Sequence, residues 1–156
     1  IVRREGTDVT LVAFSYMVVE ALRALPILAE AGVSVELIDP RTVKPLDAGL
    51  ILASVQKTGR LVIVDTGWAI CGLSAEVAAL AAERAFKALK APIRRVALPD
   101  IPTPTSHVLE QAFYPGAREI VQAVCEVMGM EHAAVRSEAE PTTHPRSSKK
   151  VFVGPF

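Results

Sequence analysis

Short apolar runs alternate along this chain with longer segments in which apolar residues recur every three or four positions. The short runs are rich in Val, Ile and Leu, which predicts buried β-strands at 1–4, 9–14, 33–39, 61–64 and 93–97. The longer segments have the spacing of amphipathic helices and cover 16–31, 46–57, 73–89 and 117–128. Because strands and helices alternate, the residues predict an α/β domain with a wholly parallel sheet and helices on both faces.

Capping residues and prolines mark the expected ends of these elements. Ser15 is placed to cap the first long helix and Gly32 to end it. Pro26 lies inside that helix and is expected to kink or divide it. Pro45 is expected in the first turn of the second long helix.

The buried run at 61–64 leads into an expected turn at Asp65–Gly72, which opens an alanine-rich helix. Residues 98–106 contain three prolines and are expected to form an extended loop. A short helix is expected after it at 108–113. The sequence is therefore interpreted as one domain over residues 1–129, followed by a polar linker or tail at 130–156. Near its end, the apolar residues 151–153 suit an edge strand, either here or on a partner.

Charge and composition narrow the function classes. Lys and Arg total 17 and Asp and Glu total 17, so the net charge is zero, which argues against nucleic acid or an anionic membrane surface as partner. The 51% apolar content has two explanations: helices of small residues on a parallel sheet, or a surface buried against a partner. No apolar run approaches the ~18 residues of a membrane span. The chain opens inside an expected strand without Met, so we expect a piece of a longer protein.

Two distant cysteines, Cys71 and Cys125, are expected to be reduced, buried or half-buried thiols, as in the cytoplasm or a mitochondrial matrix. A structural role for Cys71 is favoured over a nucleophilic one, because no His or Lys neighbours it. His107 is interpreted as a surface residue rather than the base of a catalytic triad with Ser106. The residues contain no P-loop lysine, no metal-ligand pair and no nucleophile–base set.

Ligands of open α/β sheets gather at the carboxyl ends of the strands. Helix starts at Ser15, Gly72 and Ser106, together with Arg41, make a small-anion site one hypothesis for this edge. A free-standing anion-binding module is therefore one function to test. The alternatives are a tight turn that needs glycine at Gly67 and Gly72, and an ion pair or solvated loop at Arg41.

Two further residues in the Asp65–Gly72 segment each have two interpretations. Trp68 either covers the core or anchors an interface. Asp65 ends a buried strand, and its commoner role is to accept hydrogen bonds from amides of its own turn.

Several blocks in a fixed order resemble a known family. The specific ones are I-D-P-R-T-V-K-P-L-D at 38–47 and K-T-G-R-L-V-I-V-D at 57–65, with P-D-I-P-T-P at 99–104 and F-Y-P at 113–115. With the opening block at 3–12, they resemble the C-terminal domain of transketolase-type enzymes over residues 1–128. Within that group the chain is most similar to β subunits of 2-oxo acid dehydrogenase E1 components of the pyruvate, branched-chain or acetoin type.

The resemblance implies a three-layer α/β/α sandwich with a five-stranded mixed sheet, mostly parallel, whose first strand is antiparallel. It implies a parent enzyme that decarboxylates a 2-oxo acid with thiamine diphosphate and Mg²⁺ and passes the acyl group to lipoyl E2. The cofactor and catalytic residues belong to other domains, so no catalytic, cofactor or metal residue is expected here. Such domains pack against the E1 α subunit and a second β subunit in a heterotetramer, and help dock the E2 peripheral subunit-binding domain.

The resemblance also implies a subunit interface, which we expect at Asp65, Thr66, Gly67, Trp68, Gly72, Pro104 and Tyr114. The chain departs from many relatives there. Thr66 and Ala69 occupy places that are charged in relatives, so a contact made by those charges is in doubt. Another transketolase-superfamily enzyme, such as a deoxyxylulose-phosphate synthase, is a further alternative. The blocks at 3–6 and 113–115 favour the E1 β subunit over it.

Overall fold

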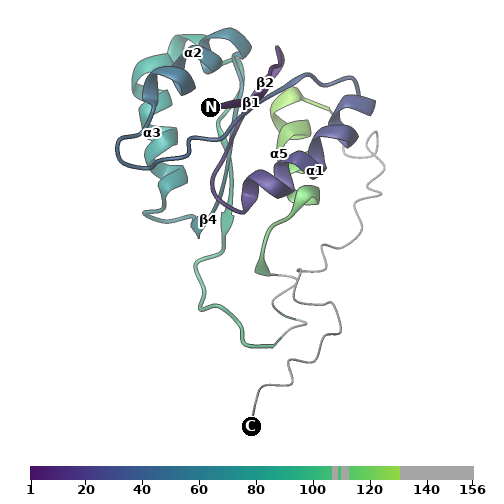
Figure 1. Ribbon diagram of the computed structural model, residues 1–156, viewed down its shortest axis with the longest axis vertical. Coiled ribbons are helices and arrows are strands. Elements are labelled where there is room, and N and C mark those ends of the chain that lie inside the picture. The colour runs from purple at the N-terminus through teal and green to yellow at the C-terminus, as the bar shows by residue number, and fades with distance from the viewer. Residues whose placement is uncertain (107–108, 110–112, 131–156) are drawn as a thin grey trace.

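The computed structural model describes residues 1–106, 109 and 113–130 (Figure 1). Its helices and strands follow the order expected from the apolar pattern. They are β1 (Val2–Arg4), β2 (Val9–Ala13), α1 (Met17–Glu30), β3 (Val35–Ile38), α2 (Ala48–Thr58), β4 (Leu61–Trp68), α3 (Leu73–Ala85), the one-turn helix η1 (Phe86–Ala88), β5 (Arg94–Leu98) and α5 (Ala117–Met128). The expected helix at 108–113 and the tail from residue 131 lie outside the described residues, apart from 109 and 113.

The five strands form one mixed sheet in the order β1-β3-β2-β4-β5. Strands β2, β3, β4 and β5 run parallel, and β1 pairs with β3 in the antiparallel sense. This confirms the mixed sheet that the family resemblance implies. The wholly parallel sheet expected from the residues was wrong for β1. Only residues 5–8 separate β1 from β2, and a parallel crossover needs about a dozen residues or more.

Gly6 lets this short connection pass close to β3. A Cβ atom on Gly6 would overlap the backbone of Val35 and Glu36. The Gly6 amide donates a hydrogen bond to Oε2 of Glu36 at 3.4 Å, which ties the connection to the third strand. The position of β1 therefore depends on a residue without a side chain.

Helices cover both faces of the sheet, which confirms the three layers (Figure 1). Helices α1 and α5 pack on one face around Leu11, Leu37 and Ile120. Helices α2 and α3 pack on the other face around a separate group of buried residues that includes Val12 and Ile63. Since both faces of the central strands are covered, β2 is buried along its whole length, as its continuous apolar run predicts.

The helices differ from the sequence-based expectation at Ser15, Pro26 and Pro45. The helix predicted at 73–89 is also shorter, because α3 ends at Ala85 and η1 follows it. Helix α1 is not divided at Pro26, although proline has no N–H to donate. Its buried positions on either side, such as Leu25 and Leu28, hold the helix on the sheet. Ser15 does not cap α1: the N-cap residue is Tyr16, and Ser15 before it lies in the left-handed region with φ of 52°.

The second long helix begins later than predicted. Helix α2 starts at Ala48 rather than near Pro45, because Asp47 caps it by accepting a hydrogen bond from the Leu50 amide at 3.0 Å. Gly59 ends the helix with φ of 76°, a conformation that favours glycine. None of the helices in the described part of the chain combines the length and apolar character that crossing a bilayer requires.

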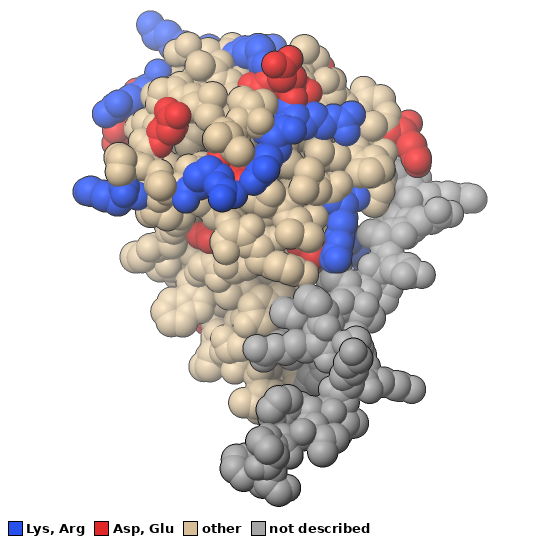
Figure 2. Space-filling view, in the orientation of Figure 1, with Lys and Arg blue, Asp and Glu red and all other residues tan. Residues whose placement is uncertain are grey.

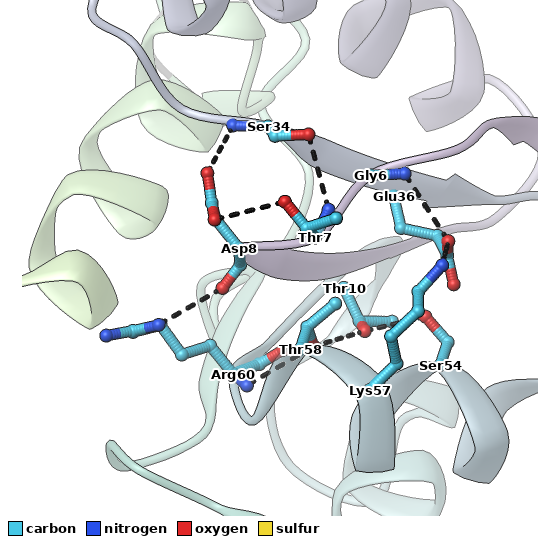
Figure 3. A network of polar contacts seen from close by, with 10 residues as sticks. All are labelled: Gly6, Thr7, Asp8, Thr10, Ser34, Glu36, Ser54, Lys57, Thr58 and Arg60. Carbon is cyan, nitrogen blue, oxygen red and sulfur yellow. Dashed lines mark hydrogen bonds and ion pairs between the residues drawn. The ribbon is translucent and has the colours of Figure 1, made fainter.

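A polar network lies where α2 meets the strands near their amino-terminal ends (Figure 3). The buried Thr10 hydroxyl lies 2.7 Å from Ser54 Oγ and 2.8 Å from Thr58 Oγ1. Nearby, Lys57 forms an ion pair with the buried carboxylate of Glu36. Burial alone would raise the pKa of Glu36, but hydrogen bonds from Lys57, Ser54 and the Gly6 amide outweigh it and lower that pKa. This network joins α2 to the sheet.

Candidate interface and binding cavity at the carboxyl ends of the strands

Strand β4 is longer than the apolar run predicts. The segment Asp65–Gly72 was predicted as a turn, but Asp65, Thr66, Gly67 and Trp68 belong to the strand. Trp68 pairs with Leu98 of β5, after an irregularity of register that follows Val64. Only residues 69–72 form the turn before α3. The prediction failed here because an Asp-Thr-Gly sequence is typical of turns, whereas pairing with β5 extends the strand.

The turn that follows, which we call the Trp68 loop (residues 68–72), is held by several contacts. The Ala69 amide donates to the Leu98 carbonyl at 3.1 Å, and Arg95 Nη1 donates to the Ala69 carbonyl at 2.6 Å. A Cβ atom on Gly72 would overlap the Trp68 carbonyl oxygen, so the loop closes tightly only with glycine there. These contacts give the loop one conformation.

This conformation turns large apolar side chains toward solvent. Trp68 is 55% exposed and Ile70 is 61% exposed, and Ile101 in the segment after β5 is 55% exposed. Figure 2 shows charged side chains mostly on the upper part of the face in view, while much of its lower part carries none. Exposed apolar residues of this size are typical of sites that contact another molecule.

The other predicted interface residues lie at different depths. Thr66, Gly67, Gly72, Pro104 and Tyr114 are partly exposed, while Asp65 is buried. The Tyr114 ring meets the buried Phe113 ring edge-on at 5.1 Å between centroids. Sequence reasoning missed Ile70, which it treated only as part of a glycine-bounded turn.

A cavity of about 570 Å³ lies at the carboxyl ends of β2, β3 and β4. It brings together Ser15 from beyond the end of β2, Asp39 and Arg41 from beyond the end of β3, and Asp65 from β4. The remaining lining comes from Arg3, Phe14, Val18, Val19, Thr42, Val43 and Leu73. Two of the three residues predicted to contact an anion, Ser15 and Arg41, therefore meet here. Ser106 does not line this cavity and is exposed elsewhere.

Two arginines surround the buried carboxylate of Asp39. Arg3 donates to Oδ2 through Nε at 3.0 Å and Nη2 at 2.7 Å, and Arg41 donates to the same oxygen through Nη1 at 3.1 Å. The Arg41 amide adds a bond to Oδ1 at 3.2 Å. Burial would raise the pKa of Asp39, but these hydrogen bonds outweigh it and lower that pKa. Arg3 was not among the residues predicted for a site.

Asp65 differs from Asp39, because its Oδ2 atom is buried without a hydrogen-bond partner. The side chain was predicted to bond amides of its own turn. Instead, Oδ2 faces Gly67, where an added Cβ atom would lie 2.9 Å away. The Ser74 hydroxyl, at the start of α3, is the other buried side-chain atom without a partner in the described part of the chain. A buried unpaired polar group costs about 1–3 kcal/mol, and more if it is charged.

The two cysteines are free thiols with different surroundings. Cys125 is buried in the core, and burial raises the pKa of its thiol. Cys71 is exposed in the Trp68 loop, so the expectation of a buried or half-buried thiol was wrong for it. His107 lies outside the described residues. Within residues 1–106, 109 and 113–130, His, Cys, Asp and Glu form no group of three or more that could hold a metal ion.

These features define an α/β/α domain with a preformed apolar loop and a polar cavity at one edge of its sheet. Residues 1–120 match the model of the family described as transketolase, C-terminal domain. The chain belongs to this family.

Curated relatives include β subunits of two kinds of oxidoreductase. The chain is 41% identical over 128 residues to the acetoin:2,6-dichlorophenolindophenol oxidoreductase subunit beta of Bacillus subtilis, covering 82% of this chain and 37% of that protein. It is 45% identical over 126 residues to the mitochondrial pyruvate dehydrogenase E1 component subunit beta of Dictyostelium discoideum, covering 81% and 35%. The chain thus spans little more than a third of the length of these relatives.

Two solved structures resemble the fold. A split-gene transketolase, in an inactive β4 tetramer, matches with a TM-score of 0.73 and 30% identity over 83% of this chain and 42% of that one. The 2-oxoglutarate:ferredoxin oxidoreductase of Magnetococcus marinus matches with a TM-score of 0.53 and 13% identity over 80% and 18%. The second likeness concerns the fold alone.

Proposed function

We propose that this chain is the C-terminal domain of the β subunit of a thiamine-diphosphate-dependent 2-oxo acid dehydrogenase E1 component. Its role there is subunit assembly and partner docking rather than catalysis. Family membership and the similarity to pyruvate dehydrogenase and acetoin oxidoreductase β subunits support this placement. The parent enzyme would decarboxylate a 2-oxo acid oxidatively and transfer the acyl group to lipoyl E2. It would act in the cytoplasm, or in the mitochondrial matrix of a eukaryote.

In this proposal thiamine diphosphate and Mg²⁺ are held by other domains of the parent enzyme. The described residues offer no cluster of acidic, His or Cys side chains that fits Mg²⁺. The proposal assigns no catalytic step to this chain.

The observation that carries the assembly role is the Trp68 loop. It presents Trp68 and Ile70 to solvent, and the hydrogen bonds of Ala69 with Leu98 and Arg95 hold it in this conformation without a partner. A contact surface that is already ordered loses less conformational entropy on binding. Tryptophan is also enriched among residues whose truncation costs at least about 2 kcal/mol of binding free energy. The proposed partners are the E1 α subunit, a second β subunit and the peripheral subunit-binding domain of E2.

The experiment compares Trp68→Ala with Phe86→Ala. Phe86 is a matched control, because it is an exposed aromatic residue on the one-turn helix η1, outside the Trp68 loop. Each variant of the 156-residue chain is mixed with the E1 α subunit of the same source and, separately, with its E2 peripheral subunit-binding domain. Sedimentation velocity then measures complex formation.

We expect Trp68→Ala to weaken association with at least one partner about tenfold or more, and Phe86→Ala to leave it unchanged. Equal association of both variants, or no association of the parent chain with either partner, contradicts the assembly role. A calorimetric titration tests the rest of the proposal. Clear binding of thiamine diphosphate by this chain alone would show that its cofactor site is not confined to other domains.

A further inference from the structure

The cavity at the carboxyl ends of β2, β3 and β4 plays no part in the proposed assembly role. It lies where the strand order changes direction: β2 leads through α1 to β3 on one side, and the chain then crosses through α2 to β4 on the other side. Open α/β sheets place ligands at this kind of position. The volume of about 570 Å³ falls within the range of about 300–1,000 Å³ that small-molecule sites occupy.

One side of the cavity suits an anionic group. Arg3 and Arg41 both donate to the single carboxylate of Asp39, so two positive charges face one negative charge. Arg41 is 61% exposed on its side-chain surface and can turn a donor toward a ligand. Leu73, the first residue of the 13-residue helix α3, also lines the cavity, so the positive end of that helix dipole borders it.

Asp65, on another side of the cavity, adds a second requirement for the ligand. Asp65 is only 7% exposed, lines the same cavity and leaves Oδ2 without a hydrogen-bond partner. A carboxylate accepts hydrogen bonds and repels a bare anion, so a ligand that reaches it must supply a donor. The apolar side chains of Val18, Val19 and Val43 lie along the same cavity and suit a short carbon skeleton.

We propose that this cavity binds a small organic anion that also carries hydroxyl groups. Its phosphate or carboxylate lies toward Arg41 and Arg3, and a hydroxyl group donates to Asp65 after a small rotation of that carboxylate. Phosphate monoesters and hydroxylated carboxylates share this chemistry. Leu73 of this cavity directly follows the Trp68 loop, and Asp65 is also a predicted interface residue, but Trp68 and Ile70 do not line the cavity. The Trp68 and Arg41 variants therefore test the two proposals separately.

Isothermal titration of the 156-residue chain with four probes tests the proposal. Glycerol 3-phosphate and glycerate carry both an anionic and a hydroxyl group, and they distinguish the phosphate from the carboxylate. Sulfate has the anion without any hydroxyl donor, and glycerol has the hydroxyls without the anion. We expect one of the two hydroxylated anions to bind, with sulfate about tenfold weaker because it has no hydroxyl to donate to Asp65. We expect no measurable binding of glycerol.

Three variants locate the binding. Arg41→Gln is expected to weaken the binding of the hydroxylated anion about tenfold. Arg84→Gln, the control, removes the same charge from an exposed position in the last turn of α3 and leaves binding unchanged. Asp65→Asn is expected to narrow the difference in affinity between the hydroxylated anion and sulfate, because an amide accepts less strongly and no longer repels the bare anion.

Circular dichroism checks that each variant is folded. If Asp65→Asn does not fold, the comparison of the four probes on the parent chain still tests the role of Asp65. The proposal is overturned if neither hydroxylated anion binds up to millimolar concentration. It is also overturned if sulfate binds as tightly as they do, or if the Arg41→Gln and Arg84→Gln variants bind the hydroxylated anion alike.

Discussion

Replacing Thr10 with Val tests whether the buried hydroxyl network joins α2 to the sheet. Thr10 lies in the central strand β2 and is fully buried. Thr58 Oγ1 donates to the Arg60 carbonyl at 3.1 Å. Since each hydroxyl has one hydrogen, Thr10 can donate to only one of its two partners, Ser54 or Thr58, and can only accept from the other. Valine has nearly the same shape and can do neither.

The expected loss follows from these two bonds. Each buried hydrogen bond contributes about 0.5–1.5 kcal/mol, and a hydroxyl left without its partner adds a desolvation penalty. We therefore expect Thr10→Val to lower the free energy of unfolding by about 2–3 kcal/mol, less the gain from burying a methyl group. With a urea m-value of about 2 kcal/mol per M, the midpoint of unfolding falls by roughly 1 M. Far-ultraviolet circular dichroism follows this transition.

A double-mutant cycle with Ser54→Ala separates the network from local packing. In the double variant no Ser54 hydroxyl is left behind, so its loss of stability should be smaller than the sum of the two single losses. An unchanged midpoint for Thr10→Val, or strictly additive losses, would refute the hydrogen-bond assignment.

Two further predictions concern buried carboxylates. Since hydrogen bonds from Lys57 and its neighbours hold the pKa of Glu36 below its ordinary value of 4.5, its contribution to stability is full above that pH and is lost as pH falls through the lowered pKa. Urea unfolding across this acidic range should show a shallower decline for Glu36→Gln, and parallel curves would contradict the assignment. The buried carboxylate of Glu20 accepts from the Ala117 amide at 3.2 Å at the start of α5, so Glu20→Ala should cost about 2 kcal/mol and lower Tm by roughly 6–10 °C. The exposed control Glu83→Ala should leave Tm unchanged, and equal Tm values for the two variants would exclude this capping role.

Much of the fold could be predicted from the residues. The apolar runs place every described strand and long helix in order, because burial inside a parallel sheet and along one helix face leaves a local pattern. The apolar pattern failed to predict the structure of a segment where that structure depends on a neighbouring strand. Strand β4 extends through Trp68 only because β5 pairs with it, and the local sequence Asp65–Gly67 has the composition of a turn.

The candidate site was predictable in part for the same reason. Ser15 and Arg41 follow different parallel strands, so topology alone brings them to one edge of the sheet. Ser106 lies beyond β5 in a segment whose path no local pattern determines, and it does not line the cavity. Arg3 was missed because the direction of β1 decides which edge its side chain reaches.

The sequence by itself determined the α/β class, the zero net charge and the blocks that resemble the family. These are properties of residues close together in the chain or of their sum. Tertiary structure alone decided that Asp39 lies between two arginines while Asp65 has an unpaired oxygen. Both carboxylates end buried apolar runs and look alike in the sequence. What separates them is strand order: β3 lies beside β1, which carries Arg3, whereas β4 lies between β2 and β5.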